Sequence, residues 1–237
     1  MTAPRPGELA ACPLVQQLDA RARGDFLAGL THRRFDKHEL LAAEGGESTE
    51  VQIIVRGAAM AWRRWHGLSA QVTGFLFAGD LLGAVAGAGQ RTSARAIAPG
   101  TLAEIPTSRL SDLAERHPSL RHALYRTVSS DFALAQDHLT ILGAMSATER
   151  VAAALLQLDR RQQARGYGPD VPLWLPMRRT DLASYLGLEL PTLSRTFSRL
   201  RAANLLVSRS TTEVLLRDRR ALADLAGEAI EAAYPSG

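Results

Sequence analysis

The sequence predicts an α+β protein with an N-terminal β-roll, a long connecting helix and a C-terminal winged helix-turn-helix. Three patterns lead to this fold class. Short β-branched runs separated by glycines fill the first half, an apolar repeat of about 3.6 residues follows, and a helix-glycine-helix segment precedes two short strands near the end. A chain of 237 residues, 46% of them hydrophobic, is long enough to bury two cores.

Composition excludes several classes of protein. Cys12 is the single cysteine, so the chain has no internal disulfide framework and cannot by itself supply the four thiolates of an iron–sulfur or zinc site. The first residues lack the basic and apolar regions of a secretory signal. The most apolar stretch, residues 75–89, is interrupted by Asp80 and is shorter than the roughly 20 residues of a membrane span. We therefore expect a cytoplasmic protein with no membrane partner.

The charge is distributed unevenly along the chain. The formal net charge is +4, yet the segment from Arg160 to Arg220 holds twelve arginines and only five acidic residues, so the remainder is slightly acidic. A basic C-terminal third indicates a polyanionic partner for that third. On charge alone, a solvated basic face is the alternative.

Residues 1–117 are expected to form the β-roll, an effector-type domain. Between about Arg34 and Ile105 the runs are short, alternating or β-branched and separated by glycines, which is typical of a small antiparallel roll or barrel. Upstream, residues 13–18 and 20–30 have helical character, with Asp19 as a candidate N-cap.

Residues 118–145 are expected to form one long dimerisation helix. The period changes from two to about 3.6 at Pro118, and the run ends at Gly143, which gives about seven helical turns. The far side of so long a helix needs a partner, so we predict a coiled-coil seam between two copies of the chain. Packing of the helix wholly against its own roll is the alternative. The predicted seam residues are Leu120, Leu124, Val128, Ala135, Leu139 and Leu142.

Residues 146–237 are expected to form the winged helix-turn-helix domain. Ser146 and Glu149 have the spacing of a capping box that begins its first helix. Further along, Leu182, Ala183 and Leu186 mark the inner side of a short helix, and Gly187 permits the sharp turn after it. A second helix begins near Pro191, since proline suits the first helical turn.

The second helix of this pair has one apolar and one polar side. Leu193, Phe197 and Leu200 lie within about 60° of one another at 100° per residue, and they are the predicted core face. The opposite side carries arginines and hydroxyls, as a helix in the major groove requires, because arginine can bind guanine O6 and N7 with two hydrogen bonds. The residues predicted to contact double-stranded DNA are Arg179, Pro191, Thr192, Ser194, Arg195, Ser198, Arg199 and Arg209.

A wing is predicted directly after the second helix. Asn204 is the expected C-terminal stop of that helix. Residues 205–208 and 213–216 then form two strands around the polar tip 209–212, where Arg209 lies. The wing makes the helix-turn-helix assignment more specific than a pair of leucine-rich helices alone.

Three segments resemble the CRP/FNR family of transcription regulators, most closely its FixK-type branch. They are His138-Leu139-Thr140-Ile141-Leu142-Gly143, Ala147-Thr148-Glu149-Arg150-Val151-Ala152 and Asp181-Leu182-Ala183-Ser184-Tyr185-Leu186-Gly187-Leu188, and the likeness covers nearly the whole chain. The resemblance implies a cyclic-nucleotide-binding-like roll and a regulator, expected to be an activator that contacts RNA polymerase. Together with the apolar seam, it predicts a homodimer on a pseudo-palindromic site.

The chain departs from the family pattern at two places. The family's recognition helix carries Glu-x-x-Ser-Arg; Ser194 and Arg195 match, but Pro191 replaces the glutamate and cannot accept a hydrogen bond from a cytosine amino group. In the roll, Gly79-Asp80-Leu81-Leu82-Gly83 is followed by Ala84 instead of a glutamate, and the stretch around Arg91 matches the phosphate-binding element only loosely. We therefore predict neither cyclic AMP binding nor an iron–sulfur cluster.

The signal, if there is one, is left open by the sequence. No cofactor is predicted; the alternative is a haem- or small-ligand-sensing roll that gates DNA binding, with axial ligands drawn from His32, His38, His66, His117, His122 and His138. Two further alternatives are a roll without a ligand and an architectural DNA binder without base preference. No hydrolase elbow, zinc-protease motif or phosphate-binding loop is present, so no enzyme is predicted.

Overall fold

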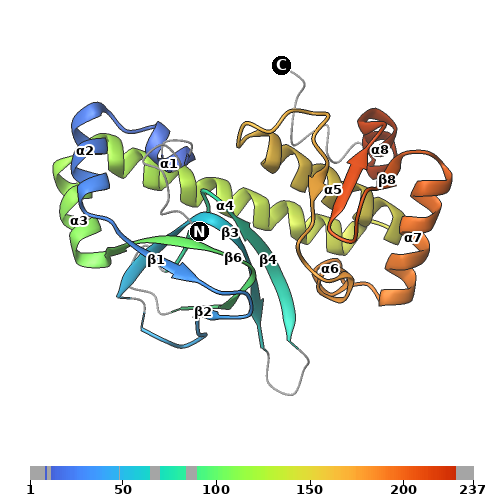
Figure 1. Cartoon of the computed structure of the whole chain (residues 1–237), viewed down its shortest axis with the longest axis horizontal. Helices are drawn as coiled ribbons and strands as arrows, with labels where there is room; N and C mark the ends of the chain where they lie inside the picture. The colour runs from blue at the N-terminus through green and yellow to red at the C-terminus, as the bar shows by residue number, and fades with distance from the viewer. Residues whose placement is uncertain (1–8, 10–11, 48, 65–69, 84–89, 228–237) are drawn as a thin grey trace. The chain divides into compact units, whose positions relative to one another are not determined.

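The computed structural model describes residues 9, 12–47, 49–64, 70–83 and 90–227. The chain divides into two compact units, residues 1–131 and 132–237, and the division falls within the long helix α4 (Pro118–Ala144). Figure 1 traces both units, with the first in blue to green and the second in yellow to red.

The first unit is built on an antiparallel sheet. Its strands run in the order β1-β6-β3-β4, with β2 also paired to β6 and β5 to β3. The predicted antiparallel roll is confirmed, although the first strand begins three residues earlier than expected. The strands are β1 (Thr31–Phe35), β2 (Leu40–Ala42), β3 (Glu50–Arg63), β4 (Gln71–Phe77), β5 (Leu81–Leu82) and β6 (Ser93–Pro106).

Along the chain, short helices come before and after the strands of this sheet. They are α1 (Pro13–Gln16), α2 (Ala20–Ala28) and α3 (Thr107–Arg116), and α4 follows. Asp19 caps α2 as predicted, because its Oδ1 accepts the Ala22 N–H at 2.9 Å. Its other oxygen accepts the Ser119 hydroxyl at 2.5 Å, which ties the start of α4 to α2. The sequence analysis missed α3, whose Leu110 and Leu113 are buried.

The core of the roll corrects part of the predicted dimer seam. One apolar cluster joins the short helices to β3 and β6 and includes Phe26, Ile53 and Ile105. Leu120 and Leu124 of α4 belong to the same cluster, and Leu120 is 0% exposed. These two side chains are already buried by their own chain, so they are not available to a partner helix. At these two positions the helix packs against its own roll, whereas Val128 and Leu139 of the predicted seam are exposed.

A close approach of two glycines allows β3 and β6 to bend across each other. The pairing of these strands shifts register between Ile54 and Ala58. Gly57 has a φ of +92°, which favours glycine. A Cβ on Gly100 would lie 2.0 Å from the Arg56 carbonyl oxygen and 2.5 Å from Phe35 Cζ, so nothing larger than hydrogen fits there.

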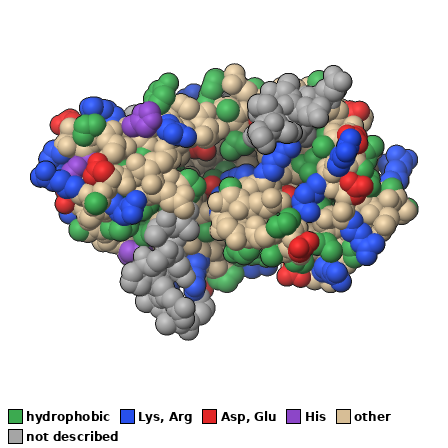
Figure 2. All heavy atoms as spheres, turned by 90° about the horizontal axis from the view of Figure 1, so that it is seen from above, with side chains coloured by type: hydrophobic (Ala, Val, Ile, Leu, Met, Phe, Trp, Pro, Cys, Tyr) green, Lys and Arg blue, Asp and Glu red, His purple; other side chains and the backbone are tan. Residues whose placement is uncertain are grey.

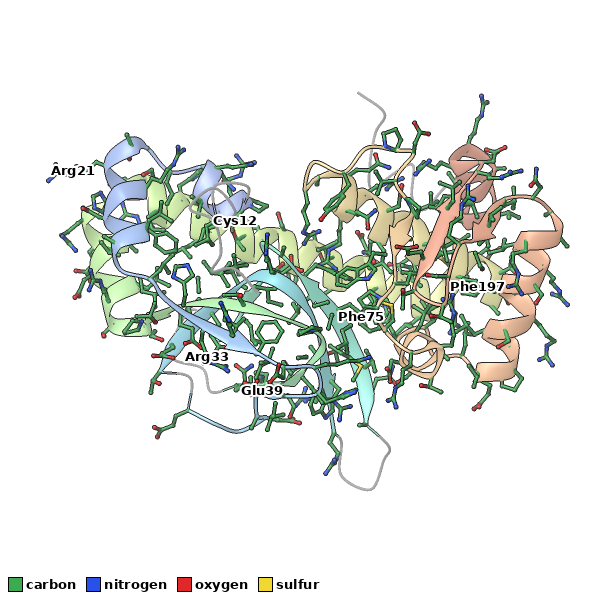
Figure 3. The ribbon with its side chains drawn as sticks, in the orientation of Figure 1. Cys12, Arg21, Arg33, Glu39, Phe75 and Phe197 are labelled. Carbon is green, nitrogen blue, oxygen red and sulfur yellow. The ribbon has the colours of Figure 1, made fainter. Side chains whose placement is uncertain are left out.

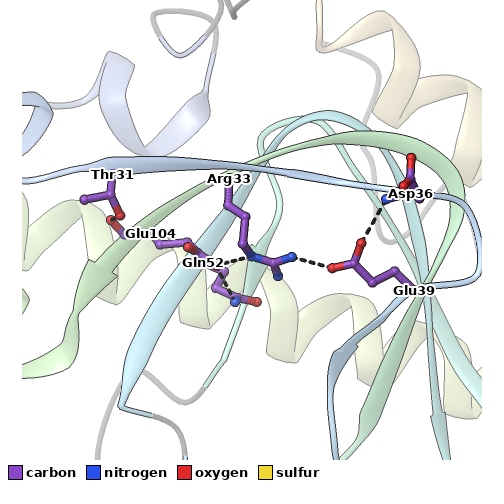
Figure 4. A network of polar contacts seen from close by, with 6 residues as sticks. All are labelled: Thr31, Arg33, Asp36, Glu39, Gln52 and Glu104. Atoms are coloured by element: carbon purple, nitrogen blue, oxygen red, sulfur yellow. Dashed lines mark hydrogen bonds and ion pairs between the residues drawn. The ribbon is translucent and has the colours of Figure 1, made fainter.

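A network of hydrogen bonds and ion pairs links side chains of β1, β3 and β6 in the roll (Figure 4). Arg33 on β1 pairs with Glu39 and, through Nε, with Glu104 Oε1 at 3.2 Å. Gln52 on β3 donates its amide to the same Glu104 oxygen at 2.8 Å, so the nearly buried carboxylate has partners from both neighbouring strands. The Asp36 N–H and then Arg33 lower the pKa of Glu39.

The second unit contains the helices and strands of the predicted winged helix-turn-helix. Its three-stranded sheet has the order β7-β9-β8, and the predicted wing hairpin is confirmed. The sequence analysis missed β7 and α8. After α4, the elements are α5 (Ala147–Gln163), β7 (Leu173–Trp174), α6 (Arg179–Tyr185), α7 (Leu190–Ala202), β8 (Leu206–Ser208), β9 (Glu213–Leu216) and α8 (Arg219–Ala226).

The junction between α4 and α5 confirms one prediction and corrects another. Ser146 and Glu149 form the predicted capping box at the start of α5. Gly143, expected to end the long helix, instead lies within α4, which continues to Ala144. A single glycine lowers helix stability without breaking the helix, and nothing lies within 4 Å of the position where its Cβ would be.

A buried ion pair attaches α8 to α5. Asp159 is only 2% exposed and receives two hydrogen bonds from Arg219, at 2.8 and 3.0 Å. Gln163 donates to the same carboxylate at 2.6 Å, and Arg219 also reaches the Pro169 carbonyl oxygen at 2.6 Å. A charge buried this deeply is tolerated only when its lone pairs are satisfied, which fixes the position of α8.

Replacing Gly100 with alanine is expected to destabilise the roll by about 1 to 3 kcal/mol, because the methyl group overlaps the Arg56 carbonyl oxygen. The measurement is the free energy of unfolding in urea. Gly24→Ala in α2 is the matched control, since no atom lies within 4 Å of its Cβ position, and it should stabilise by about 0.5 to 1 kcal/mol. Equal stability of the two variants would contradict the close approach.

Candidate nucleic-acid interface

Helix α7 buries one side in the second unit. Leu193, Phe197 and Leu200, the predicted core face, are all buried, and Phe197 is directed into the unit (Figure 3). Thr196 is buried with them, and its hydroxyl donates to the Thr192 carbonyl oxygen at 2.9 Å, so its polar group is satisfied within the helix. The apolar side of α7 is therefore fully used by the fold.

The other side of α7 is polar and accessible. Pro191, Ser194, Arg195, Ser198 and Arg199 are exposed, as their predicted role requires. Their hydroxyls and guanidinium groups are linked along the helix surface. Arg195 Nη2 donates to Thr192 Oγ1 at 3.1 Å, which orients the guanidinium along the helix instead of leaving it free to rotate.

One exposed arginine on this helix was not predicted. Arg201 Nη2 donates to Ser198 Oγ at 3.0 Å, and Ser198 Oγ in turn donates to the Ser194 carbonyl oxygen at 3.0 Å. Arg201 lies on the flank of α7, close to Ser194 in helical rotation, so counting only the arc opposite the core face overlooked it.

The turn between α6 and α7 is held by a residue that the sequence analysis did not single out. Gly187 has the predicted left-handed conformation, with a φ of +61°. Arg150 of α5 donates through Nη1 to the Leu186 carbonyl oxygen at 3.1 Å and through Nε to the Met145 carbonyl oxygen at 2.8 Å. One guanidinium thus fixes both the end of α4 and the turn that positions α7.

The start of α6 carries a two-point ion pair. Arg178 donates to both oxygens of Asp181 at 2.9 Å, and the Arg178 N–H also points to Asp181 at 3.3 Å. The Asp181 carboxylate raises the pKa of Arg178. It also satisfies an otherwise unpaired N–H at the beginning of the helix. This arrangement fixes where α6 begins.

Arg179 lies in a different setting from the other predicted contacts. Its guanidinium carbon stands 4.2 Å from the centre of the Phe197 ring, a cation–π contact inside the unit. Burial, and then the charge of Arg201, lower the pKa of Arg179. The structure therefore gives this predicted DNA residue a packing role against the core face of α7.

The wing presents the remaining predicted contact. Arg209 is exposed at the tip, where its N–H donates to the Glu213 carbonyl oxygen at 2.9 Å. Asn204 ends α7 with a φ of +60°, as predicted, and its side chain accepts a hydrogen bond from Arg217 at 2.8 Å. In Figure 2, basic side chains, in blue, are spread over the surface of the second unit.

His138 of α4 contacts the helix-turn-helix directly. Its ring stacks on Tyr185 of α6, with centroids 4.0 Å apart and planes within 11°. Nδ1 of His138 is buried without a hydrogen-bond partner. Burial lowers the pKa of His138, opposed by a backbone hydrogen bond at Tyr185. The C-terminal end of α4 is thereby packed onto α6 through the stacked rings of His138 and Tyr185.

The described residues contain no group of three or more side chains suited to hold a metal ion. Among the predicted haem candidates, His32, His38 and His122 are exposed, while His117 Nε2 lies 2.8 Å from Asp25. His66 and Ala84 lie outside the described residues. Within the described part of the chain, no helix is both long and apolar enough to cross a membrane.

Helix α4 exposes an apolar stripe in a seven-residue pattern. Tyr125 is 71% exposed, Phe132 64% and Leu139 69%, and Val128 and Ala135 lie between them and are also exposed. The spacing alternates between three and four residues, as in a coiled-coil seam. The predicted seam contains Val128, Ala135 and Leu139 of this stripe but lacks Tyr125 and Phe132, which the spacing alone could have found.

Comparisons with known proteins agree with both units. The Crp-like helix-turn-helix domain matches residues 149–225, and the cyclic nucleotide-binding domain matches residues 32–117. The fumarate and nitrate reduction regulatory protein of Escherichia coli K12 is 33% identical over 207 residues, covering 86% of this chain and 82% of that protein. The solved structure of FixK2 from Bradyrhizobium japonicum is 30% identical, with a TM-score of 0.76, covering 83% of this chain and 96% of that one.

Replacing His138 with glutamine is expected to make the free energy of unfolding depend less on pH. Because the folded-state pKa of His138 is lowered, the unfolded chain takes up a proton near pH 6.5 that the folded chain takes up only at lower pH, so stability falls as the pH drops. Urea unfolding at about pH 7.5 and 5.5 measures this change. The control is His32→Gln, at an exposed site on β1, which should lose as much stability between these pH values as the unmodified protein. If His138→Gln lost as much stability as the unmodified protein, the prediction would be wrong.

Proposed function

Because this chain belongs to the CRP/FNR family of transcription regulators, whose helix-turn-helix binds DNA, we propose that it reads a pseudo-palindromic DNA site as a homodimer and activates transcription there. The observation that carries the proposal is the two-sided helix α7, buried through Leu193 and Phe197 and polar through Arg195 and Arg199. Members of the family are regulators and not enzymes. With DNA as its proposed target, the protein is expected in the cytoplasm.

The exposed stripe of α4 supports the homodimer. Exposed aromatic and aliphatic side chains at seven-residue spacing are unfavourable in water, and burying them against an identical helix lowers the free energy. Tyr125, Val128, Phe132, Ala135 and Leu139 would form this seam, with Leu142 at its end. Two copies joined in this way would present their α7 helices to successive major grooves, about 34 Å apart.

The variant Phe132→Glu is expected to convert the dimer into a monomer, because it places two carboxylates at the centre of the seam. Sedimentation velocity measures the mass, and affinity for a two-half-site duplex should fall at least tenfold with it. Ser130→Glu, exposed on the opposite side of α4, is the matched control and should stay dimeric. A monomeric unmodified chain, with and without DNA, would refute the homodimer.

We assign base reading to Arg195 and backbone contacts to the arginines around it. Arg195 lies on the outer arc of α7, and its hydrogen bond with Thr192 already orients the guanidinium before DNA is bound. Arg199, Arg201 and Arg209 lie on the flanks and the wing, where phosphates would be reached. Ser194 and Ser198 supply hydroxyls on the same face.

The variant Arg195→Ala is expected to lose about 1 to 3 kcal/mol at the cognate site and to relax base preference at one base pair. The cognate site comes from selection out of random DNA, and fluorescence anisotropy on cognate and scrambled duplexes gives both affinities. Arg209→Ala is the control: it should weaken both duplexes alike. Equal losses on both duplexes for Arg195→Ala would refute base reading by Arg195, and a selection that returns no sequence would favour an architectural binder.

Contact with RNA polymerase is the second part of the activator proposal. Tyr167, Val171 and Trp174, around the segment between α5 and β7, are exposed and apolar. They are not on α7 and are not needed to read bases. Gathered into one patch, exposed apolar groups of this kind would offer a surface for another protein. Transcription in vitro with Trp174→Ser should keep DNA binding and lose activation.

We propose that this regulator uses neither a cyclic nucleotide nor an iron–sulfur cluster. A cavity of about 290 Å³ in the roll is lined by Glu47, Glu50 and Gln52, among others, and two carboxylates disfavour a phosphate group. The second candidate is a roll that senses haem or another small ligand through this or another cavity. An absorption spectrum after haem reconstitution, without a Soret band, would exclude the haem version.

A further inference from the structure

The first unit has a cavity of about 290 Å³ that is lined by residues of β2, of the segment after it and of the start of β3. Its inner end is formed by Leu41 of β2 and by Gln90, which are only 8% and 9% exposed. Glu47 and Glu50 also line it and are exposed, so they lie at its mouth. The volume equals the share of about ten water molecules in the liquid, which is near the lower end for ligand pockets. The cavity therefore has the size for a small molecule.

Gln90 brings a buried carboxamide to this cavity. Its N–H donates to the Gly46 carbonyl oxygen at 3.2 Å, and its own carbonyl oxygen accepts the Gly45 N–H at 2.8 Å. With its backbone engaged in this turn, Gln90 has only its side chain to offer to the cavity that it lines. In the described part of the chain, that side chain has no hydrogen-bond partner. A buried carboxamide left without a partner is unfavourable, so a ligand in the cavity would satisfy a group that the fold does not.

Gln52 presents a hydrogen-bond acceptor to the same cavity. Its Nε2 donates to Glu104 Oε1 at 2.8 Å, which fixes the orientation of the carboxamide (Figure 4). The donor side of this group is thus used within the roll, and its oxygen is left to accept. Among the described residues, no donor is bonded to that oxygen.

The charge of the cavity is negative. The described residues that line it include the carboxylates of Glu47 and Glu50 and no arginine, lysine or histidine. Within the ranges that the structure describes, the Glu47 carboxylate has no hydrogen bond or ion pair. The chain as a whole has a formal net charge of +4, so the cavity has the opposite sign from the molecule around it. This distribution attracts a cation to the cavity.

The groups that line the cavity suit an organic cation better than a metal ion. No three metal-ligating side chains come together anywhere in the described ranges, the two carboxylates of this cavity included. An ammonium group carries three N–H donors and no acceptor, which complements carboxylates and carboxamide oxygens. Leu41 and Ala42 add an apolar wall against which methylene groups can pack.

We propose that this cavity binds a small aliphatic amine in its ammonium form, held by Glu47 and Glu50 and by the side-chain oxygens of the two glutamines. Such a ligand has the opposite charge from a cyclic nucleotide, whose phosphate the two carboxylates would repel. The site lies wholly in the first unit, so the proposal does not depend on the DNA-reading function. It names the ligand chemistry of the cavity.

Two compounds of equal length test the proposal on the unmodified chain. Isothermal titration calorimetry compares 1,4-diaminobutane, which is a dication, with 1,4-butanediol, which is neutral. We expect saturable binding of one diamine per chain and at least about tenfold weaker binding of the diol, because charge-assisted hydrogen bonds are roughly twice as strong as neutral ones. Equal affinities for the two compounds would overturn the proposal, and so would the absence of saturation by the diamine up to about 10 mM.

Two variants test where the diamine binds. Glu47→Gln removes a charge at the mouth, and Gln90→Met replaces the inner carboxamide with an apolar side chain of similar length. Each should weaken diamine binding by about three- to tenfold. Glu115→Gln, at an exposed acidic position of α3 outside the cavity, is the matched control and should bind the diamine as the unmodified chain does. Because Glu47 is exposed, its variant tests the site even if Gln90→Met fails to fold.

Cyclic AMP is the third compound in the titrations, and we expect no binding of it in the cavity. Binding of cyclic AMP that Gln90→Met weakens would assign the cavity to an anion and overturn the proposal. Unchanged diamine affinity in both cavity variants would place the diamine elsewhere on the chain and overturn it as well. The comparison of diamine with diol needs no substitution, so a folding defect in a variant cannot obscure the result.

Discussion

The burial of one side of α7 is the constraint on which the rest of the second unit depends. Once Leu193, Phe197 and Leu200 fill the core, the rotation of the helix is fixed, and Arg195 has to lie outside. The surrounding polar contacts keep that helix in place. Arg150 holds the turn before α7, Asp181 fixes the start of α6, and the buried pair of Asp159 with Arg219 holds α8 against α5.

Helix α4 carries apolar residues on two different sides, not in a single stripe. Its beginning packs into the roll through Leu120 and Leu124, while further along it exposes Tyr125, Phe132 and Leu139 on a different side. The two sets coexist because they occupy different sides of the helix: at 100° per residue, Tyr125 lies about 100° around the axis from Leu124. His138 then packs its far end on α6, which joins the proposed dimer seam to the DNA-reading unit in one helix.

Patterns among neighbouring residues were enough to predict most elements of the second unit. The capping box of Ser146 and Glu149, the turn at Gly187 and the stop at Asn204 depend on residues within a few positions of one another, so they could be predicted from sequence and are confirmed. Short elements escaped: β7 has two residues, α3 has ten and α8 has eight, although α3 and α8 each bury one side. The prediction that the long helix ends at Gly143 was wrong, because a residue that weakens a helix does not always end it.

The sequence by itself determined the fold class, the order of the units and which side of α7 is polar, because period, turn residues and capping act between near neighbours. The tertiary structure decided which leucines of α4 are buried by the roll, that Arg179 packs on Phe197, and that Arg150 supports the turn before α7. These contacts join residues that are far apart in the sequence, such as Arg150 and Leu186, which are 36 positions apart, and spacing along a chain carries no information about such pairs.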